Sequence, residues 1–135
     1  MRDIAGGSKA LFLTLLPEIL AICQLPEGSS LPAWMPESGF RASLHTPGEL
    51  TVVCEQRHIP ADVKNEAGWR ALGVQGSLDF SLVGVLAALV SPLASAGVSV
   101  FALSTFDTDY LLVKETALEK ALQSLEEAGH TIVDG

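Results

Sequence analysis

The longest uncharged stretch of this chain, between Asp79 and Asp107, strongly limits how the chain can fold. It exceeds the roughly 20 residues that a membrane-spanning helix needs. Pro92, Gly97 and several serines interrupt it, however, and no cluster of basic residues flanks it. We therefore predict a helix followed by a β-strand here, and no transmembrane segment.

The composition bounds the size of the fold and its partners. The chain has 135 residues, of which 48% are hydrophobic and 18% charged, enough for one ordinary domain or two very small ones. The formal charge of −8 repels phosphate backbones and anionic lipid surfaces. We therefore expect no binding to nucleic acid or to membranes.

The two cysteines, Cys23 and Cys54, lie in separate apolar segments without CxxC spacing. Secreted domains that depend on disulfides normally use four or more cysteines. The apolar stretch at residues 11–16 is too short for a signal peptide and ends at Pro17. We predict buried free thiols and a cytoplasmic protein.

The first half of the chain has β-type patterns. We predict strands in residues 10–16 and 19–25, and a proline-rich loop over 26–39. A β-hairpin follows, turning at residues 46–49, and places Leu50, Val52 and Cys54 on one face of its second arm. Residues 1–9 are predicted to be a flexible tail, and residues 57–67 a linker.

The second half predicts the order βαββαβ. A strand begins at Trp69, a helix covers residues 82–97, and strands at 98–106 and 108–115 meet in a turn at Phe106-Asp107. A second helix with a Thr116–Glu119 capping box precedes a last strand at 130–134. The predicted apolar side of the first helix carries Leu82, Leu86, Leu89 and Leu93, and that of the second carries Leu118, Ala121, Leu122, Leu125 and Ala128.

Caps and breakers set the expected ends of these helices. Asp79 or Ser81 is expected to cap the start of the first helix, and Gly97 to close its end. Pro92 should kink or end its regular part, because proline lacks the backbone N–H. Gly129 should stop the second helix.

Two motifs in this half resemble a known family. The segments GSLDFSLVG, residues 76–84, and STFDTDYLLV, residues 104–113, are similar to the ACT domain. More specifically, they look like paired-ACT proteins related to aspartokinase regulatory domains and to the cytosolic arginine sensor of animals. The resemblance implies an α+β, ferredoxin-like βαββαβ ACT unit over residues 61–135, preceded by a degenerate, mostly β ACT-like unit over 10–60.

The resemblance also implies an amino-acid site at the loop between the first strand and first helix of the complete unit, near a unit or subunit interface. Backbone N–H groups at a helix start suit an α-carboxylate. Asp79, Asp107 or Asp109 would hold an α-ammonium or a basic side chain. Gly84 would let a ligand or a partner strand approach the helix closely. The expected ligand-binding residues are Leu78, Asp79, Phe80, Ser81, Val83, Gly84, Thr105, Phe106, Asp107, Thr108 and Asp109.

Several of these residues have structural alternatives. Asp79 is either a ligand carboxylate or a helix cap, and Asp107 either a ligand or part of the turn. An acidic residue has poor β-propensity, so Asp109 at the start of a strand points to function. Phe80 and Phe106 are either core aromatics or pocket lining, and Thr105 and Thr108 suit a strand in any case.

No catalytic or metal site can be assembled from the sequence. His45, His58 and His130 lack zinc-ligand spacing, and the chain has no GxSxG elbow and no phosphate-binding glycine loop. We expect a non-catalytic, allosteric regulatory protein that needs no cofactor, forms a homodimer and acts on a regulated protein partner. The alternative is a structural or protein-interaction module with a vestigial ligand site.

Overall fold

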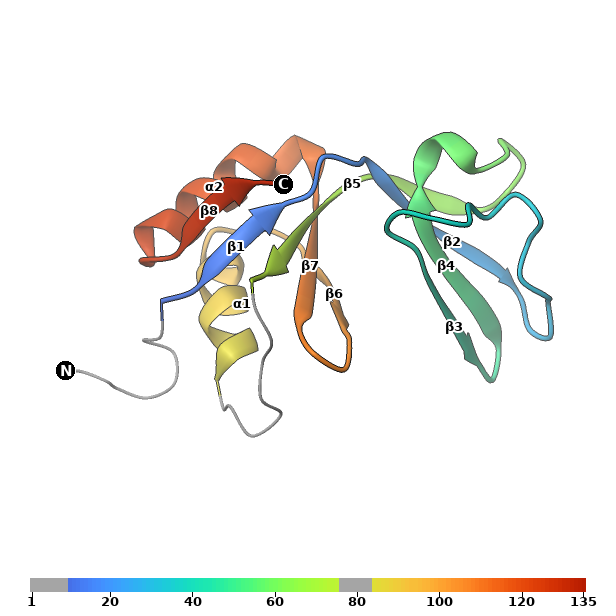
Figure 1. Ribbon diagram of the computed structural model, residues 1–135, viewed down its shortest axis with the longest axis horizontal. Coiled ribbons are helices and arrows are strands. Elements are labelled where there is room, and N and C mark those ends of the chain that lie inside the picture. Colours follow the sequence, from blue (N-terminus) through green and yellow to red (C-terminus); the bar gives the residue numbers. More distant parts are fainter. Residues whose placement is uncertain (1–9, 76–83) are drawn as a thin grey trace. The chain divides into compact units, whose positions relative to one another are not determined.

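The computed structural model describes residues 10–75 and 84–135 and divides the chain into two compact units (Figure 1). Unit 1 comprises Met1–Pro17 and Arg70–Gly135, and unit 2 comprises Glu18–Trp69. Strand β5, Asn65–Val74, contributes to both units. Residues 10–17, which we expected in the N-terminal unit, lie in unit 1 because strand β1, Phe12–Leu15, pairs there.

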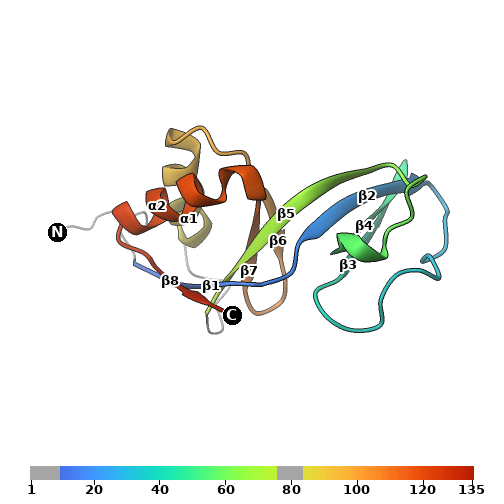
Figure 2. The ribbon, with the colours of Figure 1, turned by 90° about the horizontal axis from the view of Figure 1, so that it is seen from above.

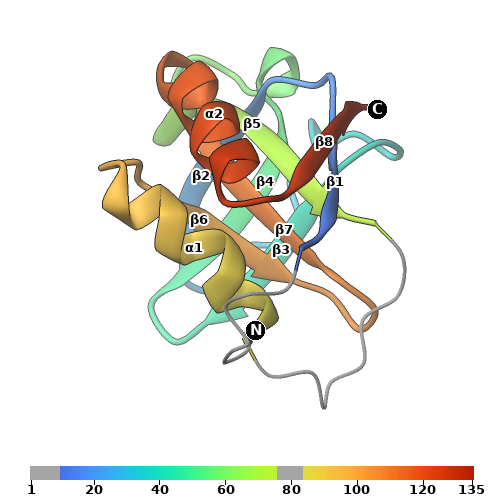
Figure 3. The same ribbon diagram turned by 90° about the vertical axis from the view of Figure 1, so that its left-hand side faces the viewer.

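Unit 1 is an α+β unit with helices on one side of its sheet (Figures 2 and 3). The strand order is β6-β7-β5-β1-β8, so β1 lies between β5 and β8. β1 pairs antiparallel with β5 and parallel with β8. The other elements of unit 1 are β1 Phe12–Leu15, α1 Val85–Ser95, β6 Phe101–Ser104, β7 Asp109–Lys114, the 3-10 helix η3 Glu115–Ala117, α2 Leu118–Glu127 and β8 Thr131–Asp134. From β5 onward, the order βαββαβ is confirmed.

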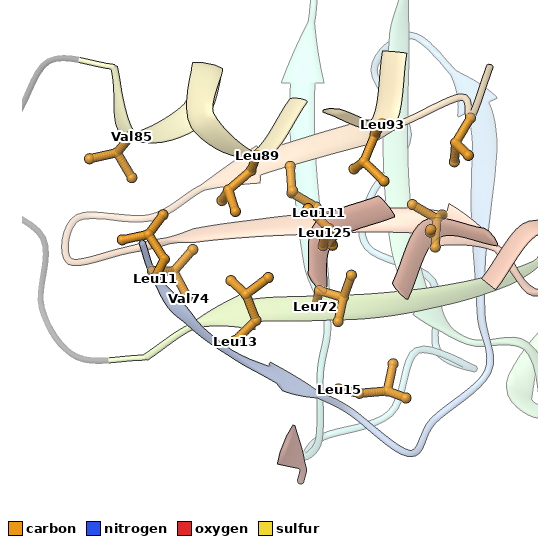
Figure 4. Close-up of a cluster of buried hydrophobic side chains, with 13 residues drawn as sticks. Leu11, Leu13, Leu15, Leu72, Val74, Val85, Leu89, Leu93, Leu111 and Leu125 are labelled. Atoms are coloured by element: carbon orange, nitrogen blue, oxygen red, sulfur yellow. The ribbon is translucent and has the colours of Figure 1, made fainter. Parts of the chain in front are cut away.

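One apolar core holds the helices of unit 1 on its sheet. Leu13 and Leu15 lie two positions apart on β1, so both point toward the helices, as the two-residue period of a β-strand predicts. Val85, Leu89 and Leu93 extend from α1 toward them (Figure 4). Helix α2 adds Ala121 and Leu125 from its predicted apolar side. Burial of this kind contributes about 25 cal/mol for each Å² of apolar surface removed from water.

Helix α1 differs from its prediction at its start and on its buried side. It begins at Val85 with Gly84 as its N-cap residue, whereas Asp79 or Ser81 was expected there. Leu82, Asp79 and Ser81 lie outside the described residues. Leu86, which was predicted on the buried side, is 38% exposed. The buried side of α1 consists instead of Val85, Ala88, Leu89 and Leu93. Pro92 lies inside the helix and does not end it.

Helix α2 begins without the predicted capping box. Thr116 belongs to the preceding 3-10 turn, and the N-cap residue Ala117 makes no side-chain capping bond. Ala128, expected on the apolar side, is exposed and lies after the last helical residue. Gly129 ends the helix as predicted, with a φ of 101°.

Unit 2 is mostly β. Its strands follow the order β3-β4-β2-β5, where β2 is Leu20–Pro26, β3 is Ala42–Thr46 and β4 is Glu49–Glu55. The predicted hairpin turn is present at Pro47-Gly48, and Leu50, Val52 and Cys54 form one buried cluster with Cys23. Trp34 and Met35 from the proline-rich loop pack on this cluster. The linker expected at 57–67 is shorter, because it contains the end of the 3-10 helix η2, Gln56–His58, and β5 starts at Asn65.

The uncharged stretch that raised the membrane question contains only short elements where it is described. Across residues 10–75 and 84–135, no helix is long and apolar enough to cross a membrane.

Candidate functional site

The hairpin between β6 and β7 ends in a two-residue tip, Phe106-Asp107, closed by two threonines. The Thr105 N–H donates to the Thr108 carbonyl at 2.8 Å. The Thr108 N–H donates in turn to the Thr105 hydroxyl oxygen at 3.1 Å. A side-chain oxygen thus replaces the backbone acceptor, as in Ser/Thr turns. We expected these threonines to be ligand-binding or strand residues, and did not predict that they close the turn.

Thr108 also fastens this tip to the end of β5. Its hydroxyl donates to the carbonyl of Val74 at 2.9 Å, across 34 positions of sequence. Val74 packs in the same core as Val85, the first residue of α1. Figure 4 places Val74, Leu11 and Val85 at one end of the core. The tip, the end of β5 and the start of α1 therefore meet at one end of unit 1.

Asp109 lies at this end on the side of the sheet that carries the helices. Leu111 and Val113 point into the core beneath the helices, and Asp109 shares their face by the alternation of β7. Ser104 faces Asp109 across the ladder, and its hydroxyl donates to Asp109 Oδ1 at 2.6 Å. This charge-assisted hydrogen bond fixes the direction of the carboxylate. Asp109 is therefore an oriented anionic group.

The start of α1 supplies groups of the opposite polarity. Gly84 has a φ of 86°, in the left-handed region that favours glycine, and its carbonyl accepts the Ala88 N–H at 2.9 Å. The first N–H groups of a helix have no acceptor within the helix, and the helix dipole adds positive potential there. This end of unit 1 therefore combines a carboxylate with a helix start suited to anions.

The structure describes six of the predicted ligand-binding residues, and it brings them to this end of unit 1. They are Gly84, Thr105, Phe106, Asp107, Thr108 and Asp109. The other five predicted residues, Leu78, Asp79, Phe80, Ser81 and Val83, lie outside the described residues. Phe106 is 81% exposed, which rules out its interpretation as a core aromatic. Asp107 is exposed in the two-residue tip, the position expected from its alternative interpretation as a turn residue.

Sequence reasoning missed two partners at this site. Ser104 and the Val74 carbonyl were not among the candidates, yet each holds a candidate residue in place. A signal for Ser104 was present, because two-residue loops pair the residues that flank them in a fixed register. The Val74 contact had no local signal.

The cysteines of unit 2 are poor nucleophiles. Cys23 and Cys54 are free and buried, as predicted. Burial, and to a lesser extent the neighbouring Cys54 thiol, raises the pKa of Cys23 to about 11. Burial, with the Glu55 carboxylate, also raises the pKa of Cys54. Reactive thiolates need a lowered pKa, so neither residue suits nucleophilic chemistry.

Comparisons with known proteins agree with this architecture. An ACT domain family model matches residues 64–127, and a model described as an N-terminal domain matches residues 18–62. The human cytosolic arginine sensor for mTORC1 subunit 1 is 30% identical over 87 residues, which cover 58% of this chain. The chain spans only 26% of the length of that relative.

Two solved structures extend the comparison to nearly the whole chain. A crystal structure of a protein from Agobacterium tumefaciens is 35% identical, covers 94% of this chain and 95% of its own, and has a TM-score of 0.89. The ligand-free regulatory subunit of aspartate kinase from Thermus thermophilus is 14% identical, covers 90% and 99%, and has a TM-score of 0.55, which shows a shared fold. The family-model match over residues 64–127, together with the order βαββαβ of the second half, shows that the chain contains an ACT domain.

Proposed function

We propose that this chain is a non-catalytic, regulatory ACT protein that binds a free amino acid at the end of unit 1 formed by α1, β5 and the β6–β7 tip. The observation that carries the proposal is the position of Asp109, oriented by Ser104 at the end where α1 starts. An amino acid carries an ammonium and a carboxylate on one carbon. Asp109 would hold the ammonium, and the N–H groups that begin α1 would hold the carboxylate.

The names of the relatives support regulation over catalysis. The curated relative is a cytosolic arginine sensor, and the Thermus structure is a regulatory subunit. Such a protein works when the ligand binds one state of the regulator more tightly than another. The amino acid would thereby change how the chain engages a regulated protein partner in the cytoplasm.

The charge distribution supports homodimerisation through α1 and the edge strand β6. The chain carries a formal charge of −8, so two copies repel each other across most surfaces. Helix α1 carries no charged residue and leaves Leu86 38% exposed. Strand β6 pairs with β7 and lies at an edge of the described sheet. Two copies would meet most easily on this uncharged side, and light scattering at micromolar concentration tests this, because a monomer would contradict it.

Thermal unfolding with each of the twenty amino acids tests the ligand proposal. A ligand at about 100 times its dissociation constant adds about 2.7 kcal/mol to the free energy of unfolding. We expect at least one L-amino acid to raise the melting temperature while its D-enantiomer does not. A folded sample that shows no shift with any amino acid at millimolar concentration would favour the interaction module with a vestigial site.

A matched pair of variants tests the site. Asp109→Asn removes the charge but retains an oxygen that accepts the Ser104 hydroxyl, so the hairpin should remain intact. Asp107→Asn makes the same change at the exposed tip. We expect the shift to disappear in Asp109→Asn and to persist in Asp107→Asn. An unchanged shift in Asp109→Asn would contradict the role given to this carboxylate.

A further inference from the structure

Proline at position 92 leaves a gap in the hydrogen bonding of α1. In an α-helix, each N–H donates to the carbonyl four residues earlier, so the residue at position 92 would normally donate its N–H to the carbonyl of Ala88. Pro92 has no N–H, yet the helix continues from Val85 to Ser95. Ala88 is 3% exposed, and a buried carbonyl without a partner costs about 1 to 3 kcal/mol.

The imidazole of His130 fills this gap. Its Nε2 lies 2.9 Å from the Ala88 carbonyl oxygen, and its Nδ1 lies 3.1 Å from the backbone nitrogen of Leu11. A backbone N–H can only donate, so Nδ1 is the acceptor and carries no proton. In the neutral ring the proton is then on Nε2, which donates to the Ala88 carbonyl. His130 is 4% exposed, so water cannot readily replace it.

The backbone around His130 is itself held rigidly. The His130 N–H donates to the Leu125 carbonyl, and the Gly129 N–H donates to the Glu126 carbonyl. This pair of bonds is the Schellman arrangement that ends a helix. The next residue, Thr131, donates its N–H to the carbonyl of Leu11 at 3.0 Å. The imidazole therefore extends from a fixed point between α2 and β8, and joins the first half of α1 to Leu11, the residue before β1.

We infer that His130 is a positioning residue for the ligand site: by supplying the hydrogen bond that Pro92 cannot, it holds the first half of α1 in place. Ala88 lies just one turn after Gly84, where the helix begins. Movement at Ala88 would move the N–H groups assigned to the amino-acid carboxylate. The last step rests on the proposed function, whereas the effect on α1 does not.

Hydrogen–deuterium exchange of the full chain without ligand tests the effect on α1. His130→Leu removes both bonds and should raise exchange at residues 88–91 about tenfold more than at residues 111–113 of β7, since tenfold corresponds to about 1.4 kcal/mol. Pro92→Ala restores an N–H to the helix. In the Pro92→Ala background, the added exchange caused by His130→Leu should fall to about threefold or less.

Two milder variants keep the test decisive if His130→Leu does not fold. Gln places an amide donor near the position of Nε2, whereas Asn places an acceptor near that of Nδ1. We expect His130→Gln to protect α1 better than His130→Asn. Equal effects of His130 substitution with and without Pro92, or better protection by Asn than by Gln, would overturn the inference.

Titration of the same variants with the twenty amino acids links α1 to the site. His130→Asn should weaken binding about tenfold, and adding Pro92→Ala should restore it. Unchanged binding in His130→Asn, despite faster exchange in α1, would overturn the positioning role. If no amino acid binds the unmodified chain, the proposed function fails, and the exchange result still decides what His130 does to α1.

Discussion

The ring of Tyr110 packs against the backbone of Gly73 on the neighbouring strand. A Cβ on Gly73 would lie 2.8 Å from Cε1 and 3.1 Å from Cδ1 of Tyr110. Leu72 and Val74 point into the core, so Gly73 and the ring lie on the face of the sheet opposite the helices. Glycine usually weakens the middle of a strand, but here it makes room for the ring.

Gly73→Ala should therefore destabilise the protein. Overpacking costs about 1 to 3 kcal/mol, reduced by the gain of about 0.4 to 1 kcal/mol that alanine brings by restricting the unfolded chain. Urea denaturation measures the difference. In a Tyr110→Ala background the same substitution should be neutral or stabilising, because the ring is gone. A cost that persists there would show that the ring is not the cause.

Thr108→Val should loosen the β6–β7 tip. The change keeps the shape of the side chain but removes the hydroxyl that bonds the Val74 carbonyl. We expect the free energy of unfolding to fall by about 1 kcal/mol, the usual value for such a bond. Thr131→Val, at an exposed strand position of β8, serves as the matched control. Equal losses in the two variants would mean that the Val74 bond contributes nothing measurable.

Gly84 can be tested for two separate roles. Its φ of 86° costs alanine about 1 to 2 kcal/mol, whereas asparagine tolerates this conformation better. Gly84→Ala should therefore lower the melting temperature more than Gly84→Asn. We also expect Gly84→Asn to abolish the amino-acid shift, because its side chain occupies space at the start of α1. If the shift survives, Gly84 serves only the backbone conformation.

The buried thiols predict a loss of stability at alkaline pH. The pKa of Cys23 is raised from 9.0 to about 11 in the folded chain, so the unfolded thiol ionises first. The contribution of the Cys23 thiol to the free energy of unfolding is fully present below pH 9 and is lost as the pH rises toward 11. The loss is up to about 2 to 3 kcal/mol, at 1.36 kcal/mol per pKa unit. Urea denaturation at several pH values measures this loss. Cys23→Ala should show a smaller alkaline loss, and an identical loss would assign it to other groups.

Features with local signals were predictable. The hairpin turn before Glu49, the apolar side of α2 and its glycine stop each depend on neighbouring residues, and the structure confirms them apart from Ala128. The tip at Phe106-Asp107 and the unusual acidic residue Asp109 were also visible, because turn chemistry and strand propensity act over a few residues. The sequence alone thus determined the α+β class, the order βαββαβ of the second half and the turn between β6 and β7.

Features that join distant parts of the chain were not predictable. Local rules expected Pro92 to kink or end the regular part of α1, but the helix continues past it, and His130, 42 positions from Ala88, supplies the missing bond. They also expected Thr116 to cap α2, where a 3-10 turn forms instead. Only the tertiary structure decided that β1 lies between β5 and β8, and that Leu11 bonds His130 across 119 positions. The physical reason is that buried polar groups and apolar strand faces take whatever partner the fold brings to them, and sequence spacing carries no record of that partner.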